Sequence, residues 1–329
     1  MGRNLKKILD QETFKPDVAF VGYPPIETAF VLSRWLKARC VPFLIDVKDQ
    51  WPHIFIDSMP MFLRPFARVA FAPYFYLGRK AMFYADGITS MADDFLNWSI
   101  RFSGRQQNAD DRVLPLTSPK ISFSEDQKAN ARCFWRSQGI DLSNNRVVFA
   151  GTITASFDIG PVVSAARYFG TKSVKDGFNC DFVFCGDGPL LPTWRELFAG
   201  LDNVYFPGWV DKLQAGTLFE DAVAALVPLK NIPNYVGNVP NKVVDALSNG
   251  LPILSGLEGT VERLIKQDGV GLFYGDNDKT LEDCLVTLLS NRELAEKIKQ
   301  NCKDVYLERY EFESVYQGLV QHLEQLSEK

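Results

Sequence analysis

The run of residues 237–252 combines the residue types that bind a diphosphate. Pro240 and Asn241 stand where a helix can begin, and Gly250 stands where that helix should end. The first N–H groups of a helix have no internal partner and the helix dipole makes that end positive, so it suits an anion. The ammonium of Lys242 adds a full positive charge there. An ordinary surface helix with a capped start would give the same pattern, and spacing alone does not separate the two interpretations.

Asp245 follows Lys242 by about one helical turn. At that position its carboxylate could accept hydrogen bonds from both hydroxyls of a ribose. The pair therefore favours a site for a nucleoside diphosphate.

A sheet must position these residues. From Arg146 onward, short apolar runs alternate with amphipathic stretches, which is typical of a parallel sheet covered by helices. We expect strands at residues 147–150, 181–185, 204–206, 222–227, 252–255 and 272–274. Strand after strand ends at a glycine or a proline: Gly151, Gly186 with Gly188, Gly208, Pro228 and Gly256. The carboxyl ends of parallel strands face the ligand crevice, so these are candidate binding loops, although turn formation alone would also explain the glycines.

The N-terminal half has fewer such units. We expect strands at residues 18–21, 43–47 and 87–90, a weaker strand at 112–116, and a long helical region over 61–84. Asp49 follows the second strand and precedes Trp51-Pro52, which makes it a candidate catalytic carboxylate or a turn former. His53 has no acidic partner fixed by spacing, so we expect a polar loop residue rather than a general base.

The order of these elements and the run from Asn238 to Pro252 resemble the retaining glycosyltransferases of family 4, which have the GT-B fold. The nearest likeness is to the bacterial polysaccharide-assembly branch, whose motif reads Pro-Asn-Lys, acidic residue, Gly-x-Pro. Further matching stretches are Val148 to Thr152 with Phe157-Asp158, Phe184 to Pro189, Val204 to Val210, and Val47 to Pro52. Each motif is short, but their order and spacing from Lys15 to the end of the chain are specific together.

The resemblance implies an α/β fold of two Rossmann-like lobes that face each other across a cleft. Residues 1–140 would form the acceptor-side lobe, residues 141–310 the nucleotide-sugar donor lobe, and residues 311–329 a C-terminal helix that returns to the first lobe. The implied reaction is that of a retaining hexosyltransferase, which moves a sugar from a nucleoside diphosphate to an acceptor hydroxyl. The expected context is cell-surface polysaccharide or glycolipid assembly, with a glycan or lipid-linked acceptor and with neither metal nor cofactor.

Site residues follow from the matching motifs. Asp245 takes the place of the second glutamate of a Glu-seven-residues-Glu motif, which holds the ribose, whereas the first glutamate falls at Gly237 and is absent. The common Gly-Arg after the first strand of the donor lobe is Gly151-Thr152 here, so the phosphate site has one cation fewer. The charge of Lys242 is therefore more important for binding phosphate.

The remaining motifs complete the predicted site. Gly208-Trp209-Val210 matches a stretch that contacts the nucleobase through backbone groups, and the loop with Gly186 and Gly188 matches one that lines the same cleft. Asp49 matches the place of a His-Asp pair that faces the donor sugar. We thus expect Asp49 and Lys242 to be catalytic, and the substrate-binding residues to be Gly151, Thr152, Gly186, Gly188, Gly208, Trp209, Val210, Asn241, Lys242 and Asp245.

Composition disfavours other classes. The 329 residues contain 36 Lys and Arg against 40 Asp and Glu, so the net charge of -4 gives no general field for nucleic acid. Two histidines and six cysteines without CxxC spacing lack the ligands of a zinc site and favour reduced core thiols of a cytosolic protein. Leu191 stands where a dinucleotide fingerprint after Gly186 would need its third glycine, and P-loop and GxSxG motifs are missing.

Two rival functions remain open at this point. A nucleotide-sugar epimerase would need additional acid and base groups, usually including a histidine. A non-catalytic relative that binds a nucleotide sugar or a partner enzyme would tolerate the missing first glutamate.

Two further expectations concern surfaces. Residues 61–84 interleave aromatic side chains with four cations, which fits either a bilayer surface at the inner face of the membrane or a core helix with a solvated edge. Residues 1–14 predict only a polar helix at 4–10 before the first strand. The N-terminal lobe would therefore lack its opening strand–helix unit, and we expect four or five strands against about six in the second lobe, with apolar side chains exposed near the first strand.

Overall fold

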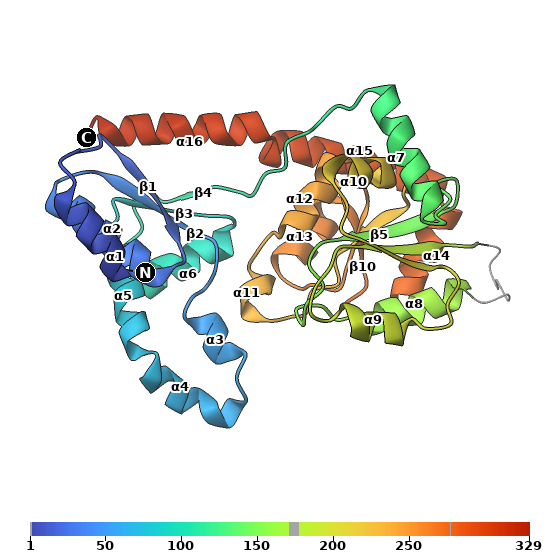
Figure 1. Cartoon of the computed structure of the whole chain (residues 1–329), viewed down its shortest axis with the longest axis horizontal. Coiled ribbons are helices and arrows are strands. Elements are labelled where there is room, and N and C mark those ends of the chain that lie inside the picture. The colour runs from blue at the N-terminus through green and yellow to red at the C-terminus, as the bar shows by residue number, and fades with distance from the viewer. Residues whose placement is uncertain (1, 171–177, 277) are drawn as a thin grey trace. The chain divides into compact units, whose positions relative to one another are not determined.

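The computed structural model describes residues 2–170, 178–276 and 278–329. Its backbone forms two compact units, each with its own sheet (Figure 1). The first unit comprises Met1–Leu116, Ile232–Val239 and Glu313–Lys329, and the second comprises Thr117–Asn231 and Pro240–Phe312. The two expected α/β units with parallel sheets are thus confirmed.

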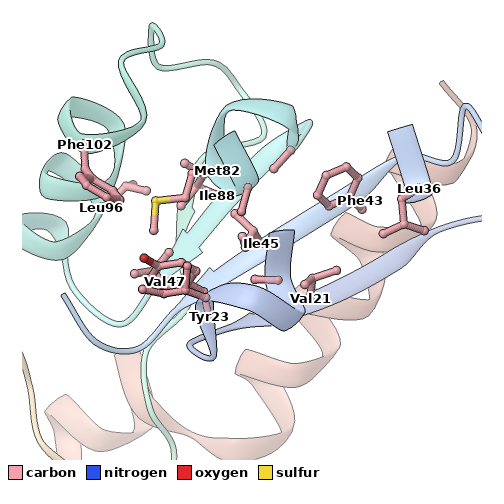
Figure 2. Close-up of a cluster of buried hydrophobic side chains, with 14 of the residues drawn as sticks. Val21, Tyr23, Leu36, Phe43, Ile45, Val47, Met82, Ile88, Leu96 and Phe102 are labelled. Carbon is pink, nitrogen blue, oxygen red and sulfur yellow. The ribbon is translucent and has the colours of Figure 1, made fainter. Parts of the chain in front are cut away.

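The sheet of the first unit has four parallel strands in the order β1-β2-β3-β4. They are β1 Ala19–Tyr23, β2 Phe43–Val47, β3 Gly87–Ser90 and β4 Arg112–Val113. Every residue of β2 is buried, because the strand lies inside the sheet and is apolar apart from Asp46, which accepts a hydrogen bond from Thr89. Its side chains meet those of β1 and of the helices in one core, which includes Val21, Tyr23, Leu36, Met82 and Phe102 (Figure 2).

Helices cover this sheet. They are α1 Gly2–Gln11, α2 Ile26–Ala38, α3 His53–Asp57, the 3-10 helix η1 Met61–Leu63, α4 Arg64–Ala70, α5 Ala72–Tyr84, α6 Asp93–Ser103, α11 Pro233–Val236 and α16 Phe312–Ser327. The long helical region expected over 61–84 is three shorter helices. Pro65 and Pro73 each stand in a first helical turn, where a missing N–H is tolerated, and they divide the region.

The sheet of the second unit has six parallel strands in the order β10-β9-β8-β5-β6-β7. The strands are β5 Arg146–Ala150, β6 Asp181–Cys185, β7 Val204–Gly208, β8 Ala224–Leu226, β9 Ile253–Ser255 and β10 Gly271–Phe273. The other elements of the unit are α7 Glu125–Ser137, α8 Gly160–Gly170, α9 Leu191–Leu197, α10 Lys212–Phe219, α12 Asn241–Ser248, α13 Thr260–Asp268, α14 Leu281–Ser290, α15 Arg292–Val305 and the π-helix η2 Tyr306–Tyr310. The predicted strand counts of four or five and six are confirmed for the described residues.

The expected helix after Pro240 is also confirmed. α12 begins at Asn241 with Pro240 as its N-cap, and it ends at Ser248. Gly250 follows in the left-handed region at φ 62°, which a glycine adopts without strain.

The limits of the units differ from the expected ones. Residues 117–140 group with the second unit because α7 packs on α10, where the buried Trp135 donates its indole N–H to the carbonyl of Gln214. Helix α16 groups with the first unit, where Leu319 and Leu326 pack against Leu44 of β2.

Two surface expectations can be compared with the structure. β1 is an edge strand, and Phe14 and Phe20 near it are 66% and 41% exposed, which confirms exposed apolar side chains there. The expectation of core thiols holds for four cysteines and is wrong for Cys40 and Cys133, which are exposed because they lie in a turn after α2 and on the outer side of α7.

Candidate functional site

The side chain of Lys242 extends from the first turn of α12 to the carboxyl end of β5. Its Nζ donates a hydrogen bond to the carbonyl of Ala150 at 2.6 Å and lies 4.5 and 5.4 Å from the ring centroids of Phe149 and Phe157. Burial lowers the pKa of Lys242 to about 8, and the charge of Asp245 opposes this only in part. Among the described residues no carboxylate lies within ion-pair distance of this ammonium. The group is therefore a half-buried cation that forms no ion pair within the described residues.

Gly151 is the residue that lets this cation approach the backbone. Its φ of 144° lies in the region that favours glycine, and a Cβ built on it would overlap the Nζ of Lys242. A larger residue at position 151 would displace the ammonium, so the glycine expected from the sequence has a specific role.

The glycine loops after β5, β6 and β7 lie side by side. Gly151 donates its N–H to the carbonyl of Cys185 at 2.9 Å, and Gly186 donates to the carbonyl of Gly208 at 2.7 Å. Gly186 and Gly188 also have positive φ values of 131° and 159°, and a Cβ on either would collide with the backbone of the neighbouring loop. The structure thus brings together the glycines that the sequence singled out. Since the N–H groups of Gly151 and Gly186 are occupied, these glycines contribute close approach rather than hydrogen-bond donors.

Backbone donors for an anion are available beside these glycines. Within the described ranges, the N–H groups of Thr152, Asn241 and Lys242 donate to no protein acceptor. Thr152 and Asn241 are exposed, and Thr152 directly follows the glycine on which the ammonium lies. Free donors and a cation in one place form a site that can hold a diphosphate.

Asp245 lies on the side of α12 that borders a cavity of about 470 Å³. Its carboxylate accepts a hydrogen bond from Ser118, and burial raises its pKa. Lys212 and Phe219 of α10 and Phe123 line the same cavity. A second, much smaller cavity of about 20 Å³ is lined by Lys242, Asp245 and Ala150, so the ammonium and the large cavity share neighbours.

The predicted nucleobase contacts lie at the end of β7. Trp209 is 76% exposed, so its indole is accessible to a ligand. Val210 is half-buried and precedes Lys212 by two residues. The structure does not bring Gly186, Gly188 or this stretch into the wall of the large cavity, so their part in binding stays a prediction.

The predicted catalytic carboxylate of the first unit has an amide partner. Asn234 of α11 is buried; its Nδ2 donates to Oδ1 of Asp49 at 3.3 Å, and its Oδ1 accepts the N–H of Gln50 at 3.0 Å. Burial raises the pKa of Asp49, which the amide of Asn234 opposes. Asn234 therefore fixes both the side chain and the loop after β2. The expectation that His53 is a loop residue is wrong, because it is the first residue of α3.

Sequence reasoning missed Asn234, Ser118 and the carbonyl of Ala150. The only available signal for Asn234 was its position as a polar residue three positions before Gly237. The resemblance places the absent glutamate at Gly237. A Cβ on Gly237 would lie 3.2 Å from the Cβ of Asp94 and 3.5 Å from the ring of Phe95. Helix α6 thus occupies the space that a longer side chain would need.

In the described ranges, no group of three or more His, Cys, Asp and Glu side chains is arranged to hold a metal ion.

Comparisons with known proteins concern the fold and the family of the second unit. Residues 144–291 match the model of the family described as glycosyl transferases group 1. This segment contains all six strands of the second unit, together with Gly151, Gly186, Gly208, Lys242 and Asp245. The class that the fold defines is GT-B, with two Rossmann-like parallel α/β units.

Three particular proteins resemble the chain. Over 143 residues it is 27% identical to sulfoquinovosyl transferase SQD2 of Arabidopsis thaliana, a match that covers 40% of this chain and only 26% of that protein. The structure of HepE from Anabaena in complex with UDP-glucose superposes with a TM-score of 0.70 at 14% identity, covering 100% of this chain and 82% of that one. The sucrose-phosphate synthase of Thermosynechococcus elongatus gives a TM-score of 0.71 at 13% identity, covering 99% and 77%. At these identities the two structures show the fold.

Proposed function

We propose that the protein is a retaining glycosyltransferase that moves a hexose from a nucleoside diphosphate to an acceptor hydroxyl. The observation that carries this proposal is the half-buried ammonium of Lys242, which lies against Gly151, the residue before Thr152 with its free N–H group. Burial destabilises the charged form of Lys242 and so lowers its pKa. A bound diphosphate would stabilise this charged form.

The donor would be arranged from its phosphates outward. Lys242, Thr152 and the start of α12 hold the diphosphate, Asp245 accepts the ribose hydroxyls, and Gly208-Trp209-Val210 contacts the nucleobase. The match to the glycosyl transferase family model and the likeness to a structure that contains UDP-glucose support a nucleotide-sugar donor. Because Gly186 and Gly188 have no side chain, the neighbouring loops approach each other closely and leave space for the ligand.

Cleavage of the donor bond places negative charge on the leaving diphosphate. Fixed donors and a cation at that point stabilise the transition state more than the ground state, which is how they would raise the rate. The proposed reaction needs no cofactor, because Lys242 and the N–H groups supply the positive charge that a metal would otherwise supply.

Asp49 would act on the donor sugar. Its carboxylate is half-buried, has a raised pKa and accepts a hydrogen bond from Asn234, so it is oriented without an ion pair to any cation of the described residues. We propose that this carboxylate stabilises positive charge that develops on the sugar ring during transfer.

The proposed biological context rests on the likeness of the Pro-Asn-Lys motif to that of the bacterial polysaccharide-assembly branch. This motif indicates cell-surface polysaccharide or glycolipid assembly, with a glycan or lipid-linked acceptor. We propose a cytoplasmic location at the inner face of the membrane, where the donor and such an acceptor would both be accessible.

A donor hydrolysis assay tests the activity. The full chain is incubated with UDP-, GDP-, ADP- and dTDP-hexoses, and proton NMR follows the free sugar and its first anomeric form. Release with retained configuration, lost in Lys242→Met and kept in Lys299→Ala on α15, is expected. Binding without release in all four would favour the non-catalytic relative, and conversion to an epimer would favour the epimerase.

A further inference from the structure

A group of apolar side chains on η1 and α4 has no covering within the first unit. Met61, Phe62, Phe66 and Val69 are 80%, 73%, 74% and 76% exposed, and Leu63 is 41% exposed. We refer to these five residues as the apolar surface. Single exposed apolar residues are common in proteins, but five within nine positions of the chain form a continuous feature.

Helix geometry places this surface on one side. Phe62, Phe66 and Val69 recur at spacings of three and four, so they share a face. Ala67, the buried residue of α4, points to the opposite side. In Figure 1, α4 lies beyond α3 and α5 on the side of the first unit away from its sheet. The apolar surface is thus presented outward by a helix whose other face is already packed.

Cations adjoin this surface, and acidic residues do not. Between Asp57 and Asp86 the sequence contains Arg64, Arg68, Arg79 and Lys80 and no Asp or Glu. Arg64 is engaged, since it donates to the carbonyls of Asp57 and Met59. In the part of the chain that the structure describes, neither Arg68 nor Arg79 forms an ion pair with a carboxylate.

Arg68 and Arg79 border an open cavity of about 510 Å³ between α3, α4 and α5. His53 and Tyr76 also line it. The ring of His53 packs edge-on against Phe75 and other aromatic rings, while its buried Nδ1 has no hydrogen-bond partner in the described residues. Two guanidinium groups without carboxylate partners in the described residues make this cavity suitable for a phosphate group, and that of Arg79 also lies 5.6 Å from the ring centroid of Phe102.

We propose that the apolar surface inserts into the headgroup boundary of an anionic bilayer, while Arg68 and Arg79 bind the phosphate of a lipid. A helix that buries an apolar face a short way into the boundary and pairs its cations with anionic headgroups is a known mode of peripheral attachment. Tyr76, which is 58% exposed at the cavity, has the amphipathic side chain favoured at such boundaries. The attachment is peripheral because every helix in the described residues is too short or too polar to cross a bilayer.

The charge pattern favours a bilayer over a protein partner. A protein interface usually excludes charge from its apolar centre, whereas here unpaired arginines stand beside the apolar side chains with no acidic residue among them. An anionic lipid surface satisfies both groups at once, since its acyl region takes the apolar side chains and its phosphates take the arginines. The proposal goes beyond sugar transfer and does not depend on it.

Vesicle flotation of the full chain tests this proposal. Wild-type protein is mixed with vesicles of phosphatidylcholine alone or with about a third phosphatidylglycerol, without any donor. We expect binding to the anionic vesicles. The double variant Phe62→Ser/Phe66→Ser should bind at least about tenfold more weakly. Arg68→Gln/Arg79→Gln should lose about fivefold per arginine on anionic vesicles only, with a weaker dependence on salt.

Two control variants test whether binding depends on these particular residues or on any exposed apolar side chain or arginine. Leu307→Ser/Val320→Ser removes apolar side chains that are 60% and 52% exposed elsewhere, and Arg101→Gln/Arg167→Gln removes two other exposed arginines. Both controls should float like the wild type, and circular dichroism confirms that every variant is folded. Equal loss in the controls, or no wild-type binding to anionic vesicles, would overturn the proposal.

A depth measurement does not depend on the loss variants. A nitroxide label on Val69→Cys, in a chain whose exposed Cys40 and Cys133 are serine, should gain access to oxygen when anionic vesicles are added. The same label on Phe14→Cys should not. A Val69 label that remains in water while the protein floats would show that another surface binds the lipid. Neither measurement involves a sugar donor, so failure here and failure of the proposed function are distinguishable.

Discussion

The substitution Lys242→Met should make the folded protein more stable while it weakens donor binding. Burial holds the pKa of Lys242 near 8, against an ordinary value of 10.5, so the folded state carries the charged ammonium at an energetic cost. Methionine has a similar length and no charge, so it removes this cost without leaving a large void. A residue kept for stability would behave in the opposite way.

The magnitude follows from the pKa and from the contacts of the ammonium. A lowering from 10.5 to about 8 corresponds to about 3 kcal/mol of unfavourable burial. The hydrogen bond to Ala150 returns about 1 kcal/mol, and the contacts with the rings of Phe149 and Phe157 together return about another 1 kcal/mol. At pH 7 the variant should therefore be more stable by about 1 kcal/mol. Loss of a charge-assisted bond to the diphosphate should weaken binding by about 10- to 150-fold.

Urea unfolding and calorimetric titration with the nucleoside diphosphate measure the two effects. Between pH 8 and 10.5 the unfolded wild type binds more protons at this position than the folded protein does, so wild-type stability should rise through that window. The rise attributable to position 242 should be missing in the variant. Lys299→Ala serves as control, because Lys299 is a half-buried lysine outside the candidate site whose ammonium pairs with Glu296 at 3.1 Å. A variant that loses more than about 2 kcal/mol of stability yet binds the diphosphate normally would refute the reasoning.

Three other outcomes follow from the same site. Donor affinity should be constant below pH 7 and should fall by up to about tenfold per pH unit above pH 8, because Lys242 loses its proton. Titration with a nucleotide sugar across pH 6–9.5 measures this affinity. A profile that does not change with pH would contradict a role of the ammonium in donor binding. Asp245→Asn should raise the donor dissociation constant by about 10-fold with a smaller change in turnover, whereas an unchanged constant would remove the ribose contact. Activity should persist in EDTA, and a complete loss that manganese or magnesium restores would mean that an ion handles the leaving-group charge.

Local signals in the sequence predicted most of the fold. β2 at Phe43–Val47 and β6 at Asp181–Cys185 are apolar runs bounded by turn residues, and both have the expected bounds. α12 was predicted because Pro240 and Gly250 mark its two ends. The region 61–84 was expected as one helical stretch, since its apolar composition outweighed Pro65 and Pro73, which divide it in the structure.

The site depended on contacts that no local pattern encodes. The Nζ of Lys242 meets Ala150 across 92 positions of the chain, and Asn234 meets Asp49 across 185. The sequence could place the glycines at strand ends, but it could not show that a missing Cβ at Gly151 makes room for an ammonium. It placed Gly151 and Gly186 among the substrate-binding residues, whereas their N–H groups join neighbouring loops.

The central claim is that a diphosphate binds between Gly151-Thr152 and the start of α12. Hydrogen exchange followed by mass spectrometry tests it most directly, with the full chain alone and saturated with whichever of UDP, GDP, ADP and dTDP binds most tightly. Slower exchange is predicted for the free N–H groups of Thr152, Asn241 and Lys242, and it should disappear in Lys242→Met at the same nucleotide concentration. Saturated protein with unchanged exchange at these three positions, or no binding of any of the four nucleotides, would contradict the account.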